Sequence, residues 1–223
     1  YDSVAGCEAA DDNASGVAGV LELARVLARK PWRRTLVVAC WDDEENGLLG
    51  SRAHVAARTD AAPPIAVAFN FDGIGIARRE PGSQAIPTGF GVLFPDEVTA
   101  LHAREDRGDF IAVVADEAAT VHARRLAEHA GTLALPIALL SLSRVWITLP
   151  VAIDLRRSDH ASFWAADVPA VMITDTADFR SASYHCRGGA DAITGLDPGF
   201  MRDVVAASAF AIVHALTASP ADQ

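Results

Sequence analysis

A run of four acidic residues, Asp42 to Glu45, follows directly after the apolar stretch TLVVACW. An apolar stretch of this kind is expected to be buried, so the carboxylates should stand at the edge of a low-dielectric interior. Like charges held together there repel one another and lose hydration. We therefore expect a positive charge to compensate them.

Further carboxylates stand at two other places where chemistry is possible. Asp72 follows a second apolar run in NFDGIG, and Asp11 and Asp12 precede a helical pattern in EAADDNASG. Taken singly, Asp72 is explained as a turn residue and the Asp pair as N-terminal helix caps. Carboxylates that converge with a histidine are instead ligands for zinc, or for two divalent ions bridged by one carboxylate. A bound metal would supply the missing positive charge.

Two histidines stand near other polar residues. His185 occurs in SYHCRGG, where an exposed loop imidazole is the alternative to a ligand. His160 follows Ser158 and Asp159 in RRSDHASFW, where a polar helix cap is the alternative. A serine hydrolase that uses Ser158, Asp159 and His160 is the competing class of enzyme, and it is disfavoured because three consecutive residues do not normally form nucleophile, base and orienting group and the chain has no GxSxG motif.

The periodicity of apolar residues predicts alternating strands and helices. Apolar runs predict strands at 35–41, 65–71, 110–114 and 169–174. Helical spacing predicts helices at 17–29, 48–58, 117–129, 161–166 and 200–215, the third with Val121, Leu126 and Ala130 facing inward. The apolar segment 133–155 contains Pro136 and Pro150 and is left unassigned. This alternation predicts an α/β fold, a three-layer α/β/α sandwich with a mostly parallel mixed sheet.

That architecture predicts where the acidic residues lie. In open α/β sheets, ligands bind beyond the carboxyl ends of the strands. Asp42 to Glu45 and Asp72 each follow a predicted strand, so we expect them at the same edge of the sheet.

Composition restricts the classes of function. The 223 residues fit one sizeable domain, and the formal net charge of −10 offers no general footprint for nucleic acid or anionic membrane. No apolar run is judged long enough to span a bilayer. The chain begins at YDSVAG without a signal-peptide pattern, so the compartment is not specified, and cytoplasmic, periplasmic and secreted locations all stay open. The oligomeric state is also open.

The three cysteines show no metal-binding or disulfide spacing. Cys40 stands in an apolar run and is interpreted as a small core residue. Free loop thiols are the default expectation for Cys7 and Cys186. The alternatives are that Cys186 approaches a metal or pairs with Cys7.

Six motifs together resemble a known family. YDS, ADDNASG, WDDEENGLLGS, NFDGIG, RRSDHASFW and SYH occur in the order found in the zinc-dependent exopeptidases that include bacterial leucyl aminopeptidases, glutamate carboxypeptidase and glutaminyl cyclases. The resemblance extends from the first residue to His185. It implies a phosphorylase/hydrolase-like fold, with residues 1–223 forming one zinc exopeptidase catalytic domain whose earlier strands would precede them. It also implies an aminopeptidase that uses two zinc ions on a peptide or aminoacyl substrate.

The resemblance assigns roles to five residues. Asp12 would bridge the two zinc ions, Glu45 and His185 would complete one site, and Asp72 would bind the other ion. Glu44 would be the general base, close to the metals but not bound to them. A carboxylate in that position could take the proton of the attacking water and pass it to the leaving amine.

Other positions match the family less completely. Asp2 matches the acid that orients a histidine ligand of the second zinc, and that histidine would stand directly before Tyr1. Arg157, Asp159 and His160 would lie near the substrate cleft or behind the ligands.

Two alternatives to an aminopeptidase stay open. One is a catalytically impaired relative that acts as a binding or dimerisation module. The other is a glutaminyl cyclase-like zinc acyltransferase. Asp42 and Asp43 are expected to be supporting or surface acids in every case.

Overall fold

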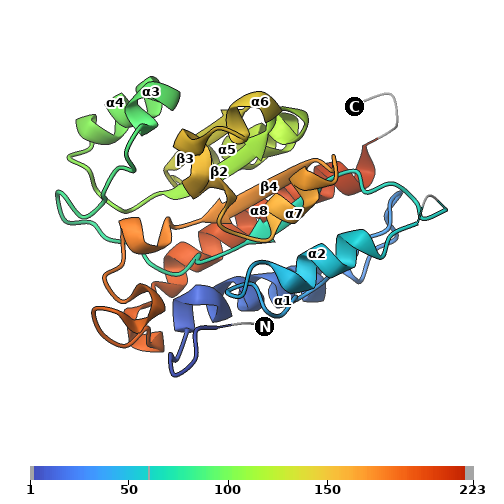
Figure 1. The fold of residues 1–223 in the computed structure, drawn as a ribbon, viewed down its shortest axis with the longest axis horizontal. Helices are drawn as coiled ribbons and strands as arrows, with labels where there is room; N and C mark the ends of the chain where they lie inside the picture. Colours follow the sequence, from blue (N-terminus) through green and yellow to red (C-terminus); the bar gives the residue numbers. More distant parts are fainter. Residues whose placement is uncertain (1–2, 60, 219–223) are drawn as a thin grey trace.

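A four-stranded sheet forms the centre of the protein in the computed structural model, which describes residues 3–59 and 61–218. The strands are β1 (Ala68–Phe71), β2 (Ile111–Asp116), β3 (Ile137–Leu142) and β4 (Ala170–Thr174), in the spatial order β1-β4-β2-β3 (Figure 1). β1 pairs in parallel with β4 and β2 in parallel with β3, whereas β2 and β4 are antiparallel. The predicted mostly parallel mixed sheet is therefore confirmed.

Three helices cover one face of the sheet. They are α1 (Gly16–Leu27), α5 (Thr120–Thr132) and α8 (Pro198–Thr217). Leu126 of α5 and Val204 of α8 pack with Val113 and Ile173 of the sheet in one fully buried apolar cluster. α8 begins where Asp197 accepts a hydrogen bond from the Phe200 amide, a side-chain cap that satisfies a free N–H of the first turn.

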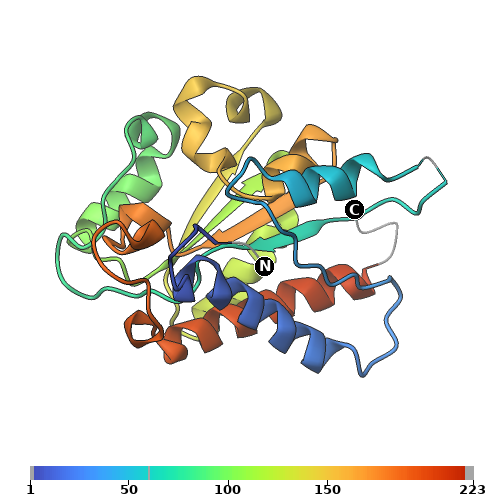
Figure 2. The same ribbon diagram turned by 60° about the horizontal axis from the view of Figure 1, so that its bottom comes forward.

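Shorter helices cover the opposite face, and Figure 2 shows α2 and α7 on the other side of the sheet from α1 and α8. These helices are α2 (Leu49–Ala56), α3 (Phe90–Leu93), α4 (Pro95–Ala103), α6 (Arg144–Ile147) and α7 (His160–Ala165). Phe90, Leu140, Phe163 and Met172 belong to the second buried cluster on this side. The protein is thus an α/β/α sandwich, as predicted.

Single helical turns connect these elements. A π-type turn spans Ala10–Ser15, and 3₁₀ turns span Glu117–Ala119, Pro150–Arg156, Ala177–Phe179, Tyr184–Cys186 and Ile193–Gly195. The Ala10–Ser15 turn lies near the carboxyl end of β1. Side-chain hydrogen bonds, such as those of Asn13 and Asp11, hold it in place.

Most predicted elements are present, with shifted bounds. β1 is shorter than the predicted strand at 65–71, and the unassigned segment 133–155 supplies β3 and α6. Within α5, Leu126 and Ala130 face inward as predicted. Val121 does not, because 44% of it is exposed.

The predicted strand at 35–41 is wrong. No residue of this run pairs in a sheet among the residues described, and Val37 and Val38 are 70% and 44% exposed. A cavity of about 1010 Å³ lies between the run and the edge strand β1, since both line it. Hydrophobicity predicted a buried strand, but the run is largely exposed, and no residue of it pairs with a neighbouring strand in the described part of the chain.

The sequence predicts no segment long and apolar enough to span a membrane, but α8 meets both criteria. By length and composition alone this one helix would qualify. Its side chains at Phe200, Val204, Ala211 and Leu216 are packed in the core beneath the sheet.

Candidate metal centre

The turn that carries Asp12 is docked onto the turn that follows β1. The side chain of Asn13 donates to the carbonyl of Phe71 at 2.9 Å and accepts from the amides of Gly16 and Gly73, each at 3.2 Å. Gly16 is required at this contact, because a Cβ there would lie 2.5 Å from the Phe71 carbonyl oxygen. This arrangement places Asp12 beside the carboxyl end of β1.

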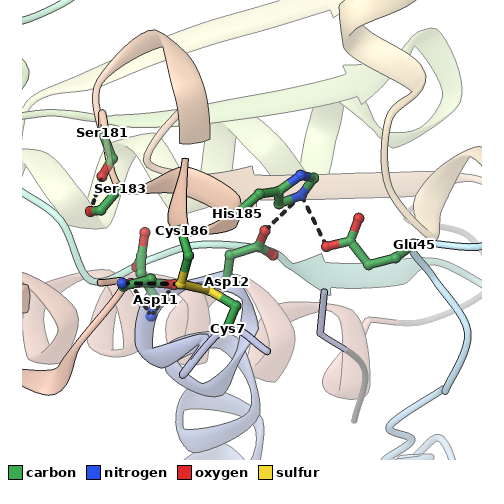
Figure 3. The surroundings of a disulfide bond; sticks show 9 residues. Cys7, Asp11, Asp12, Glu45, Ser181, Ser183, His185 and Cys186 are labelled. Carbon is green, nitrogen blue, oxygen red and sulfur yellow. Dashed lines mark hydrogen bonds and ion pairs between the residues drawn. A yellow bond between two sulfur atoms is a disulfide. The ribbon is translucent and has the colours of Figure 1, made fainter. Parts of the chain in front are cut away.

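Asp11 does not act as the helix cap that its position suggested. Its carboxylate accepts the amide of Gly75 at 2.8 Å, and its carbonyl accepts the hydroxyl of Ser15 at 2.7 Å. Asp11 is therefore buried and links the Asp12 turn to the turn after β1. The side chain of its neighbour Asp12 points toward His185 instead (Figure 3).

Asp72 is positioned by the sheet and by a buried serine. Its amide donates to the carbonyl of Ile173 at 3.1 Å, which continues the pairing of β1 with β4 by one residue. The neighbouring hydroxyl of Ser158 favours the charged form of the Asp72 carboxylate, and that hydroxyl accepts from the side-chain amide of Asn70 at 2.7 Å. Asp72 and Asp12 are neighbours, since the charge of Asp72 contributes to the raised pKa of Asp12.

Glu44 and Glu45 are presented by a tight turn before α2. The carbonyl of Glu44 accepts the amides of Gly47 and Leu48 at 3.0 and 2.9 Å, and the carbonyl of Asp42 accepts the amide of Gly50 at 3.1 Å. Both glutamates are half-buried, whereas Asp42 and Asp43 are exposed. The acidic run is thus divided into two residues that face the protein and two that face solvent.

His185 joins Asp12 and Glu45 from a distant loop. Its Nε2 lies 3.0 Å from Oε1 of Glu45 and 3.3 Å from Oδ2 of Asp12 (Figure 3). One ligand atom from each of the three residues lies within 4.8 Å of the others. The imidazole is stacked on the ring of Tyr184 at a centroid distance of 3.7 Å, which fixes its plane.

The pKa values of these groups show the cost of bringing them together. Burial, followed by the charges of Asp72 and Glu45, raises the pKa of Asp12 to about 9. Burial and the same two neighbours raise the pKa of Glu44 to about 9. Burial also raises the pKa of Asp72, and it lowers the pKa of His185. Like charges in a site of this kind ionise together only if a cation compensates them.

The donor set fits a divalent metal. Two carboxylates and an imidazole are ligands that zinc accepts, and ligand atoms about 2.1 Å from a tetrahedral ion lie about 3.4 Å apart. The two measured separations from Nε2 of His185 are close to that value. Oδ2 of Asp12 and Nε2 of His185 are also buried without a hydrogen-bond partner among the described residues. Two buried atoms of this kind that face each other need a shared partner.

A disulfide joins the two loops of the cluster. Cys7 and Cys186 are bonded, with their Cα atoms 5.6 Å apart (Figure 3). The expectation of free loop thiols is therefore wrong, and the pairing alternative is correct. Cys40 is exposed rather than buried, because the run in which it stands is not a strand.

The remaining predicted site residues are dispersed. Arg157 bonds Asp178 at 2.9 Å and the hydroxyl of Tyr184 at 3.2 Å, at the edge of the cluster. Asp159 is buried, and its charge contributes to the raised pKa of Glu44. Asp2 lies outside the described residues.

His160 does not face the cluster. Its ring is fully buried, with Nε2 2.8 Å from the carbonyl oxygen of Leu155 and its edge against Trp164. Burial lowers the pKa of His160 to about 4. Because the Ser158 hydroxyl accepts from Asn70 and the His160 ring bonds the Leu155 carbonyl, these residues form no serine hydrolase relay.

Three contributors were not found from the sequence. Asp191 accepts the amides of Asp11 and Asp12, Asn70 supports Ser158, and Tyr184 stacks on His185. Tyr184 was visible in the SYH motif, but Asp191 stands in GGADAIT, where no spacing marks it.

A smaller cavity of about 220 Å³ adjoins the cluster, since Asp72, Arg157 and Tyr184 form part of its lining. The rest of the lining is largely apolar and comes from α3, α4 and the sheet; it includes Ile86, Phe90, Phe94, Phe110, Ala138, Leu140 and Met172. Segments 82–105 and 133–155 both contribute to the lining of this cavity.

Comparison with known proteins places the chain in a family. Residues 1–133 match the model of "Peptidase family M28". The chain belongs to peptidase family M28. It is 35% identical over 189 residues to the uncharacterised protein YfbL of Escherichia coli strain K12, which covers 80% of this chain and 52% of YfbL. A probable zinc metalloprotease of Pyrenophora tritici-repentis is 38% identical over 72 residues, or 32% of this chain and 17% of that protein.

Solved structures share the fold of this M28 chain. The zinc aminopeptidase BSAP of Bacillus subtilis superposes with a TM-score of 0.66 at 20% identity, covering 98% of this chain and 45% of BSAP. The LapA aminopeptidase of Legionella pneumophila gives 0.66 at 21% identity, covering 96% and 48%. The chain spans about half the length of the relatives that it matches along most of its own length.

Proposed function

We propose that this M28 chain carries the zinc centre of a metallo-exopeptidase, most consistent with an aminopeptidase. The observation that carries the proposal is the convergence of Asp12, Glu45 and His185, whose ligand atoms lie within 4.8 Å of one another. Family membership supports the same conclusion. The relatives named as zinc aminopeptidases and zinc metalloproteases support zinc as the metal and a peptide as the substrate.

We assign the residues as follows. Glu45 and His185 hold one zinc ion, Asp72 contributes to a second site, and Asp12 lies between them. The effect of the Asp72 charge on the pKa of Asp12, and the separation of 3.3 Å between Asp12 and His185, support this bridging position. When bound, zinc lowers the pKa of a water to about 7 and polarises a carbonyl group.

Glu44 is proposed as the general base. Its carboxyl group shares the charge environment of Asp72, Glu45 and Asp12, yet it is not one of the three clustered ligands. It can hold the proton removed from the attacking water and deliver it to the nitrogen of the leaving amine. Burial and the neighbouring acids raise the pKa of Glu44 to about 9 in the metal-free protein, and bound zinc would lower it toward the working pH that a general base requires.

The test uses the intact protein, purified with zinc, and a panel of aminoacyl chromogenic substrates. We expect release of the chromophore, loss of activity in a chelator and recovery on adding zinc. Elemental analysis should give about two zinc ions per chain, as a bridging carboxylate implies. A protein that binds no zinc and hydrolyses none of the panel would instead be a binding module.

A further inference from the structure

The loop of His185 and the turn of Asp12 are joined by more than the ligands themselves. The Cys7–Cys186 bond links residues 179 positions apart, and its two cysteines stand next to His185 and just before the Asp12 turn (Figure 3). The bond therefore joins the two segments that carry Asp12 and His185. None of the six quoted motifs contains Cys7 or Cys186.

Asp191 forms a second connection between the same two segments. Its carboxylate accepts the amide of Asp11 at 3.0 and 3.1 Å and the amide of Asp12 at 3.0 Å, and its carbonyl accepts the amide of Ala10 at 2.9 Å. The amide of Asp191 in turn approaches Sγ of Cys186 at 3.5 Å. Three consecutive amides of the Asp12 turn are thus held by one buried side chain and backbone on the His185 loop.

Regular secondary structure does not fix this loop. His185 and Cys186 both have left-handed backbone angles, with φ of 55° and 57°, a conformation that is unfavourable for residues other than glycine. The acids around the turn also repel, since the charges of Asp11 and Asp191 contribute to the raised pKa of Asp12. Without a cross-link, we expect the loop to relax and the acids to separate.

We propose that Cys7, Cys186 and Asp191 are positioning residues that hold Asp12 and His185 at metal-binding separation before a metal arrives. Ligands that are already in place lose less conformational freedom on binding, so the disulfide should increase the affinity for zinc. This inference rests on the proposed function, because it takes Asp12 and His185 to be ligands.

The test measures zinc affinity of the metal-free intact protein by competition with a chromogenic chelator. We expect the double variant Cys7→Ser/Cys186→Ser to bind zinc about 10- to 100-fold more weakly than wild type, the range found when groups that orient ligands are removed. Asp191→Ala should weaken binding in the same direction. Asp191→Asn, which keeps one carbonyl oxygen as acceptor, should restore part of the loss.

A matched variant separates positioning from general destabilisation. Leu126→Ala leaves a cavity in the core between α5 and the sheet, remote from the loops, so it should lower the melting temperature without changing zinc affinity. The proposal is overturned if Leu126→Ala weakens zinc as much as the cysteine substitutions do. It is also overturned if the double variant binds zinc within about twofold of wild type.

A second measurement tests the inference without the double variant, in case that variant does not fold. Oxidised wild type is compared with wild type that has been reduced by a phosphine and alkylated at its thiols, and equal zinc affinity would overturn the inference. If oxidised wild type binds zinc and reduction has no effect, the proposed function survives alone. If oxidised wild type binds no zinc, both proposals fail.

Discussion

Glu44 and Glu45 are adjacent in the chain but have different surroundings. Oε1 of Glu45 lies 3.0 Å from Nε2 of His185, and among the residues described Glu45 shares a ligand cluster with His185 and Asp12, whereas Glu44 is outside it. The Glu44 carbonyl accepts the amides of Gly47 and Leu48 and so closes the turn that presents both glutamates. One carboxylate is thereby available to bind a metal while its neighbour is available to move a proton.

This division predicts the effect of Glu44→Gln in the intact protein. The amide keeps the size of the side chain but cannot accept the proton of the attacking water, so kcat should fall by about 10²- to 10⁴-fold. Zinc content should stay at the wild-type level, because Glu44 is not among the clustered ligands. Steady-state kinetics and elemental analysis on the same sample check both statements.

Asp43→Asn is the matched control for that substitution. Asp43 belongs to the same acidic run but is exposed, and its side chain contacts Asn46. It should leave kcat within about twofold of wild type, as surface changes generally do. Equal losses in the two variants would argue against a specific role for Glu44.

The raised pKa of Asp12 predicts that zinc binding releases protons. At pH 7 a carboxyl with a pKa of about 9 is protonated in the metal-free protein, and a ligand must lose that proton. Calorimetric titration of zinc at pH 7 in two buffers of different ionisation enthalpy should show release of about one proton or more. Asp12→Asn should lower that number, and no buffer dependence would contradict the assignment.

The same pKa predicts how stability depends on pH. The pKa of Asp12 is about 9 in the folded state and 3.8 ordinarily, so between these values the folded state binds more protons. The stability of the metal-free protein should therefore be greatest at low pH as far as Asp12 is concerned, and be lost as pH rises through 9. Zinc should remove this trend, which melting curves at pH 6 and pH 9 would show.

Ser158 predicts a separate effect on the metal. Its hydroxyl favours the charged form of the Asp72 carboxylate and accepts from the side-chain amide of Asn70, so Ser158→Ala should reduce zinc affinity by about 10- to 100-fold. Ser162→Ala is a fitting control, because Ser162 is another buried serine nearby in the chain that bonds Ser51 at 2.8 Å instead. Chelator competition should separate the two variants.

The sequence predicts most of the fold because long apolar runs formed β2 and β4 and clear helical spacing formed α5 and α8. The prediction of a strand at 35–41 failed, because an apolar run indicates only a tendency to be buried and does not indicate which strand would pair with it. The antiparallel pairing of β4 with β2 was equally hidden, because strand direction depends on the connections. The motifs indicated which acids meet His185, but the Cys7–Cys186 pair and Asp191 depend on contacts between distant segments.

The apolar cavity beside the cluster predicts substrate preference. Its lining of Phe90, Phe94 and Met172 adjoins Asp72, so it is placed to accept the side chain of a large apolar terminal residue. Ala138→Leu should fill part of this space and lower kcat/KM for leucyl and phenylalanyl substrates about 10- to 200-fold relative to alanyl substrates. Ala18→Leu, at an exposed position of α1, is the matched control and should leave the ratio unchanged. If the ratio is the same in both variants, the terminal side chain binds elsewhere, and the 220 Å³ cavity is a packing defect of the core.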